Sequence, residues 1–94
     1  MAYNSPIRFE KTLRTSSSYH MEVDVNKDDC NREGAHWHLC QDGRRIGQIF
    51  TYGSWKETPN VSSSIRREAE ELTSTWRSEI ESAYNHNREH GAGY

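Results

Sequence analysis

The dipeptide Asp42-Gly43 constrains the fold of this chain more than any other feature, because alternating apolar and polar residues flank it on both sides. Asp-Gly suits the central positions of a type I′ hairpin, where glycine accepts a positive φ freely and aspartate tolerates one. A two-residue turn also fixes the register of its strands. We therefore predict strands at 35–41 and 44–52, with Gln41 opposite Arg44. The predicted pairs beyond it are Leu39 with Ile46, Trp37 with Gln48, and Ala35 with Phe50.

This register divides the hairpin into two faces. The apolar face carries the residues that we assign to the core, which are Trp37, Leu39, Ile46 and Phe50. The opposite, wetter face carries His36, His38 and Cys40, across from Ile49, Gly47 and Arg45. A third strand is predicted at 19–26, where strict alternation places its apolar residues on one side, namely Tyr19, Met21, Val23 and Val25.

One long amphipathic helix is predicted after the sheet. Its start is indicated by Thr58-Pro59 or by the Ser62–Ser64 run, and its end by Gly91. Its apolar stripe, at spacings of three and four, consists of Ile65, Ala69, Leu72, Trp76, Ile80, Ala83 and Tyr84. The predicted fold class is α+β, a three-stranded antiparallel β-meander followed by one long C-terminal amphipathic helix packed on the sheet.

A chain of 94 residues suits a single domain, which we place at 19–90. Residues 1–18 are polar and are expected to form a flexible N-terminal arm, although the alternation of Ile7 and Phe9 would also allow an added edge strand. Residues 91–94 are expected to be a frayed tail.

The charge balance, twelve Lys+Arg against fourteen Asp+Glu, gives no global reason to expect a nucleic acid or a membrane as partner. The chain has no run of 18 apolar residues, and its N-terminus lacks the apolar region of a signal peptide. These features predict a cytoplasmic protein, most simply bacterial or from a phage. In that reducing compartment Cys30 and Cys40 are expected to be free thiols, with a disulfide as the alternative.

The tripeptide His36-Trp37-His38 is the most pointed candidate site, because positions i and i+2 of a strand share a face. Three roles are open to the two histidines. They are surface residues of a half-exposed strand without a function of their own, groups that move protons or contact RNA, or ligands of a metal. A metal would need a third ligand from elsewhere, for which the candidates are His20, Asp24 and Cys30. The sequence has no closed zinc-binding pattern, nucleotide-binding glycine loop, nucleophile motif or paired carboxylates, so we expect no metal, no cofactor and no catalytic residue.

Two further features are candidates for binding. The first consists of two arginines next to the predicted hairpin turn, Arg44 and Arg45, together with Lys56. These side chains would either contact phosphate groups or simply be solvated charges at the surface. Trp55 would be either an exposed anchor for a protein partner or a buried ring at the seam between sheet and helix. The predicted binding residues are Trp55, His36, His38 and Arg45.

The chain from about 19 to 88 resembles a family of small bacterial proteins of unknown function, some encoded in toxin–antitoxin-like gene pairs. The matching pieces are Val25-Asn26 with Asp28, the strand His36-Trp37-His38, the segment Gly53-Ser54-Trp55-Lys56-Glu57, and the helix containing Trp76. A shorter likeness to HicA-type mRNA interferase toxins lies in Gly34-Ala35-His36, Asp42-Gly43-Arg44-Arg45, Gly53 and Ile65-Arg66-Arg67. The second resemblance implies a fold like a double-stranded-RNA-binding domain, with His36 as the catalytic residue.

The function that we predict from the sequence is a small non-enzymatic interaction module. It is expected to bind a protein partner in a toxin–antitoxin-like or mobile-element system. One alternative is a small metal-independent ribonuclease with His36 and His38 as acid–base groups and Arg44 and Arg45 on phosphate. The other alternative is a metal-stabilised binding domain.

Overall fold

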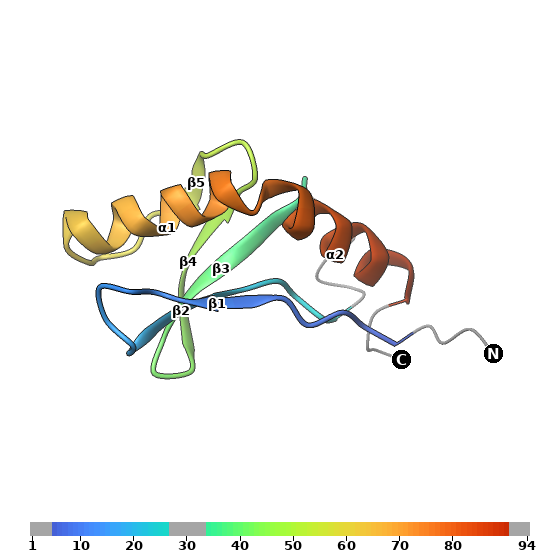
Figure 1. The fold of residues 1–94 in the computed structure, drawn as a ribbon, viewed down its shortest axis with the longest axis horizontal. Helices are drawn as coiled ribbons and strands as arrows, with labels where there is room; N and C mark the ends of the chain where they lie inside the picture. The colour runs from blue at the N-terminus through green and yellow to red at the C-terminus, as the bar shows by residue number, and fades with distance from the viewer. Residues whose placement is uncertain (1–4, 27–33, 91–94) are drawn as a thin grey trace.

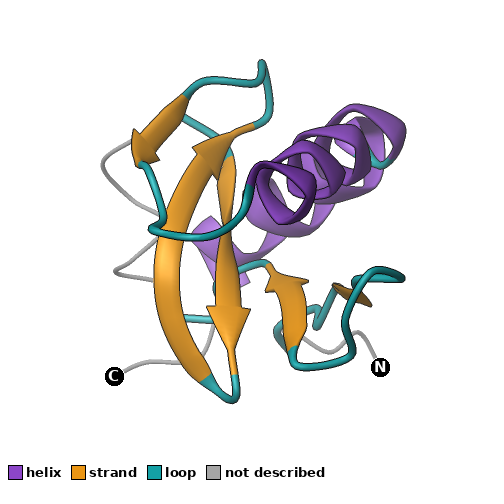
Figure 2. Cartoon of the chain, turned by 90° about the vertical axis from the view of Figure 1, so that its left-hand side faces the viewer, coloured by secondary structure: helices purple, strands orange, loops and turns teal. Residues whose placement is uncertain are grey.

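The computed structural model describes residues 5–26 and 34–90 of the chain. Five strands form one antiparallel sheet in chain order, and two helices follow them (Figure 1). The strands are β1 (Glu10–Thr12), β2 (Tyr19–Glu22), β3 (His36–Gln41), β4 (Arg44–Phe50) and β5 (Trp55–Glu57), and the helices are α1 (Ser63–Thr75) and α2 (Arg77–His90). Both helices lie on the same side of the sheet (Figure 2).

The α+β class and the antiparallel sheet agree with the sequence, but the predicted three-stranded meander with one long helix is wrong. The extra strands are β1, which pairs with β2 and lies in the segment expected to be an arm, and β5, which pairs with β4. Each has only three residues, so its alternation is too short to stand out in a sequence. Next to β1, Leu13 is buried in the core.

The hairpin register begins as predicted and then shifts. Asp42 and Gly43 have φ angles of 50° and 84°, as a type I′ turn requires. Gln41 pairs with Arg44 and Cys40 with Arg45, but a β-bulge follows, and Ile46 is left without a partner on β3. The predicted pairs beyond the bulge are therefore wrong. The observed pairs are Leu39 with Gly47, His38 with Gln48, Trp37 with Ile49, and His36 with Phe50.

The bulge changes which residues of β4 enter the core. Ile49 takes the place expected for Ile46 and Phe50 and is fully buried beside Trp37 and Leu39. Ile46 and Phe50 are only partly buried. Met21 of β2 also belongs to the core, as do Leu13 and Val23, which directly follow β1 and β2. The helices contribute Ile65, Ala69, Ile80, Ala83 and Tyr84.

The predicted single helix is interrupted at Trp76, where α1 ends and α2 begins (Figure 1). The Thr73 hydroxyl, one turn before, donates to the Ala69 carbonyl at 2.7 Å and accepts the indole N–H of Trp37 at 2.8 Å. A threonine that bonds back to residue i−4 bends a helix, and here it also ties the bend to the sheet. Neither helix within the described ranges is long and apolar enough to cross a membrane.

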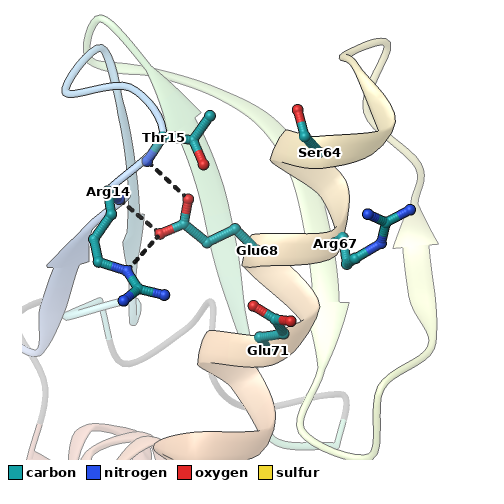
Figure 3. A pocket seen from close by; sticks show the side chains of 6 residues that line it. All are labelled: Arg14, Thr15, Ser64, Arg67, Glu68 and Glu71. Carbon is teal, nitrogen blue, oxygen red and sulfur yellow. Dashed lines mark hydrogen bonds and ion pairs between the residues drawn. The ribbon is translucent and has the colours of Figure 1, made fainter.

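Glu68 of α1 fixes the loop that connects β1 to β2. Its carboxylate accepts the backbone N–H groups of Arg14 at 2.6 Å and Thr15 at 3.0 Å (Figure 3). Burial by itself raises the pKa of Glu68, but the hydrogen bonds from Thr15 and Arg14 prevail and lower it. A surface hollow lies at this point, and the Glu68 carboxylate that lines it is already hydrogen-bonded to the loop. The hollow is lined by Arg14, Thr15, Ser64, Arg67, Glu68 and Glu71.

Candidate metal centre

Asp24, His36 and His38 converge on the side of β3 opposite to Trp37. His36 and His38 alternate along β3 with the buried Trp37. Glu22 pairs with His38, so Asp24, two residues beyond Glu22, reaches the same part of β3. The side chains of Asp24, His36 and His38 are 2%, 2% and 10% exposed. Three residues of metal-ligand type are thus gathered and withdrawn from water.

The distances among these side chains fit the spacing of ligands around one ion. Asp24 Oδ2 lies 2.8 Å from His38 Nε2 and 3.7 Å from His36 Nε2. Zinc bonds of ~2.0–2.1 Å in tetrahedral geometry place neighbouring ligand atoms about 3.4 Å apart. The two distances to Asp24 Oδ2 bracket that value, and the three ligand atoms all lie within 4.8 Å of one another.

The orientation of His36 is fixed by the backbone. Its Nδ1 lies 2.8 Å from the carbonyl oxygen of Gly34, which can only accept, so Nδ1 carries a proton. His36 Nε2 faces Asp24 Oδ2 at 3.7 Å, and a proton on Nε2 points to that carboxylate. When a metal binds, that proton leaves and the lone pair of Nε2 points to the ion instead. A carbonyl that sets the tautomer of a ligating histidine is a recurrent feature of metal sites.

The Asp24 carboxylate is ionised. Burial by itself raises the pKa of Asp24, but hydrogen bonds from His36 and His38 and the charge of Arg45 prevail and hold that pKa well below its usual range. Arg45 forms an ion pair with Asp24 Oδ1, which leaves Oδ2 to face the histidines. Arg45 also contacts Glu22 Oε2 at 3.3 Å. One guanidinium therefore joins two carboxylates on this face.

Helix α2 closes one end of the site. Asn87 is fully buried and donates through Nδ2 to the Asp24 carbonyl at 2.7 Å. The ring of Tyr84 packs edge-on against His36, with centroids 5.2 Å apart. The backbone of Asp24 and the ring of His36 are thus both positioned by the same helix.

A second group lies beside the first on the same face. His20 Nε2 is 3.0 Å from Glu22 Oε1, and both are close to the Sγ of Cys40, a buried free thiol. Burial and the neighbouring Glu22 raise the pKa of Cys40 to about 12. Cys40 is therefore a thiol at neutral pH and not an activated nucleophile.

The residues predicted to bind from the sequence fall into two separate places. His36, His38 and Arg45 belong to one cluster. Trp55 lies elsewhere, on β5, where it pairs with Ile49 on the core side and donates from Nε1 to Glu70 of α1 at 2.7 Å. Arg44 is exposed at the hairpin turn.

Sequence reasoning named Asp24 only as one of three candidates for a third ligand and missed Glu22, Asn87 and Tyr84. A usable signal for Glu22 was nevertheless present. The alternation of 19–26 places His20, Glu22 and Asp24 on the polar face of one strand, and His36, His38 and Cys40 share the polar face of its neighbour. Pairing these two faces brings the clusters together. Asn87 and Tyr84 come from a distant helix and leave no such pattern.

No protein-family model, curated protein or solved structure matches this chain.

Proposed function

We propose that this protein is a small metal-stabilised binding domain that holds a divalent transition-metal ion, such as zinc, at this site. The ligands are Asp24 Oδ2, His36 Nε2 and His38 Nε2. The observation that carries the proposal is the burial of both imidazoles around one ionised carboxylate oxygen, at 2.8 and 3.7 Å, with His36 oriented by Gly34. The proposal departs from the sequence-based expectation that no metal is bound.

The chemistry of the donors selects the class of ion. Calcium and magnesium prefer sites made wholly of oxygen, whereas imidazole nitrogens suit zinc, copper, nickel and iron. Two histidines and one carboxylate supply three ligands and leave at least one coordination position for water or another group. The site therefore fits a transition metal that is held by three protein ligands and has at least one open coordination position.

An ion at this position would stabilise the fold. It would join the end of β2 to β3 through Asp24 and His38, which are fourteen residues apart in the sequence. An ion that binds the folded chain and not the unfolded chain adds about 2.7 kcal/mol when its concentration is ~100 times its dissociation constant. That is a large share of the stability of a small domain.

Thermal melts of the full chain test the proposal. Zinc should raise the melting temperature of the wild type, and a chelator should reverse the rise. The rise should be smaller in Asp24→Asn and His36→Gln than in the wild type, and each variant is first melted without metal to establish that it folds. His86→Gln is the matched control, because His86 is a histidine that contacts the backbone of Ser5 instead. A wild-type melt that zinc leaves unchanged contradicts the proposal.

A second function is favoured by the hydrogen bond between Asp24 and His38, which is the geometry of a histidine acid–base group oriented by a carboxylate. In a ribonuclease of this kind, His38 would move the proton, and Arg45 would stay on Asp24 instead of binding phosphate. RNA cleavage that persists in a chelator and is lost in His38→Gln would favour this function over the metal site.

A further inference from the structure

His20, Glu22 and Cys40 form a compact group of three different ligand types. His20 and Cys40 are cross-strand partners on β2 and β3, and Glu22 lies two residues along β2 on the same face. One ligand atom from each, namely an imidazole nitrogen, a carboxylate oxygen and Sγ, lies within 4.8 Å of the other two. The geometry of the sheet, and not a flexible loop, therefore holds the group together.

This group is open to solvent where the Asp24 group is closed. The side chains of His20 and Glu22 are 24% and 30% exposed, whereas Cys40 below them is 1% exposed. An ion could therefore reach His20 and Glu22 from water and meet the sulfur beneath them. Asp24 and His36, at 2% each, offer no comparable access.

The local charge also favours a cation. Glu22 and Asp24 both carry carboxylates on this part of the sheet, and Arg45 forms ion pairs with both. Arg45 thus compensates two negative charges with one positive charge. A second cation beside Glu22 would complete the neutralisation without displacing Arg45 from Asp24.

We propose that His20 Nε2, one Glu22 oxygen and Cys40 Sγ form a second metal site, which takes a thiophilic transition metal such as zinc. A thiolate ligand distinguishes this site from the first, because sulfur selects softer ions than imidazole and carboxylate alone. When the metal–sulfur bond forms, the thiol proton leaves to solvent, and any proton on His20 Nε2 moves to Nδ1 or leaves as well.

Cobalt is a probe that separates the two sites, since only a site with a thiolate gives a sulfur-to-cobalt charge-transfer band in the near ultraviolet. The titration uses the full chain carrying Cys30→Ser, so that Cys40 is its one remaining cysteine. The charge-transfer band should appear in this protein and persist in His36→Gln. It should vanish in Cys40→Ser and in Cys40→Ala, while the visible cobalt bands of the Asp24 site remain in both.

Each possible result of the cobalt titration either supports or overturns the second site. A band that is present in the wild type and lost on Cys30→Ser alone would assign the thiolate to Cys30 and overturn the second site. Visible cobalt bands with no charge-transfer band would overturn the second site and leave the first standing. A charge-transfer band in the Cys30→Ser protein, together with a Cys40→Ser variant that shows no visible cobalt bands, would support the second site and overturn the first.

Discussion

Asn87 donates from its side-chain amide to the backbone carbonyl of Asp24 at 2.7 Å, across 63 residues of sequence. The same amide group accepts from the N–H of Ile7 at 2.8 Å and donates to the carbonyl of Ile7 at 2.9 Å. Asn87 therefore joins the N-terminal segment, the candidate metal centre and α2 through one fully buried side chain. Because its bond to Asp24 goes to the backbone carbonyl, we infer that Asn87 positions the residue that carries the carboxylate.

Replacing Asn87 with alanine should weaken metal binding by about tenfold to a hundredfold, because Asp24 would lose the contact that orients it. The variant should also melt lower without metal, since the buried Asp24 carbonyl loses its donor and both hydrogen bonds to the Ile7 backbone are lost. The zinc titration should be repeated on Asn85→Ala, which removes an exposed asparagine from the same helix. Equal zinc affinity in both variants would contradict the positioning role.

Glu68 should make the stability of the domain fall at acid pH. Because the pKa of Glu68 is lower in the folded chain than in the unfolded chain, its contribution is present above the unfolded value, about 4.3, and is lost as the pH falls through the folded value. Glu68→Gln should cost about 1–3 kcal/mol at neutral pH and progressively less in acid.

Urea unfolding across the acid range measures this difference between wild type and Glu68→Gln. Glu71→Gln is the control, since Glu71 is exposed on the same helix. A cost that stays constant as the pH falls would show that the charge of Glu68 does not hold the loop at Arg14 and Thr15.

Thr73→Val should cost about 1–3 kcal/mol although it preserves shape, because the buried indole N–H of Trp37 would be left without its acceptor. Thr73→Ser keeps the hydroxyl and should cost less. The two free energies of unfolding, measured in denaturant, give the comparison. A valine variant as stable as the serine variant would show that the hydrogen bond between helix and sheet contributes nothing.

Gly47→Ala should destabilise the domain by about 1–3 kcal/mol. A Cβ at this position would lie 3.1 Å from Pro59 Cδ, 3.1 Å from Trp55 Cζ3 and 3.2 Å from the carbonyl oxygen of Glu57. Gly34→Ala is the control, because its Cβ would meet only Phe50 Cδ1, at 4.0 Å. If both variants have the melting temperature of the wild type, β5 is not packed on β4 as described.

The sequence could predict those parts of the fold that depend on local chemistry. The Asp42-Gly43 turn and the first two hairpin pairs follow from the preference of that dipeptide for positive φ. The bulge at Ile46 could not be predicted from the sequence, because it depends on how β4 packs against its neighbours. The same holds for the break at Trp76, where an apolar stripe continues through a bend set by Thr73.

The candidate site was predictable in part for the same reason. His36 and His38 share a face by strand periodicity alone, whereas the approach of Asp24 requires the pairing of β2 with β3. Trp55 shows the converse case, because its type allowed either a partner anchor or a ring at the seam between sheet and helix, and its hydrogen bond to Glu70 joins β5 to α1 at that seam. The protein partner, the RNA alternative, the toxin–antitoxin-like setting and the cytoplasmic location stay predictions.

Anomalous diffraction at the zinc edge, from crystals of the full chain grown with zinc, tests the central claim most directly. The metal site of Asp24, His36 and His38 predicts an anomalous peak about 2.0–2.2 Å from His36 Nε2, His38 Nε2 and Asp24 Oδ2. The same peak should be absent from crystals of His36→Gln. A map of the wild type with no peak at these three atoms, or with zinc only on partly exposed histidines such as His86 and His90, would contradict the claim.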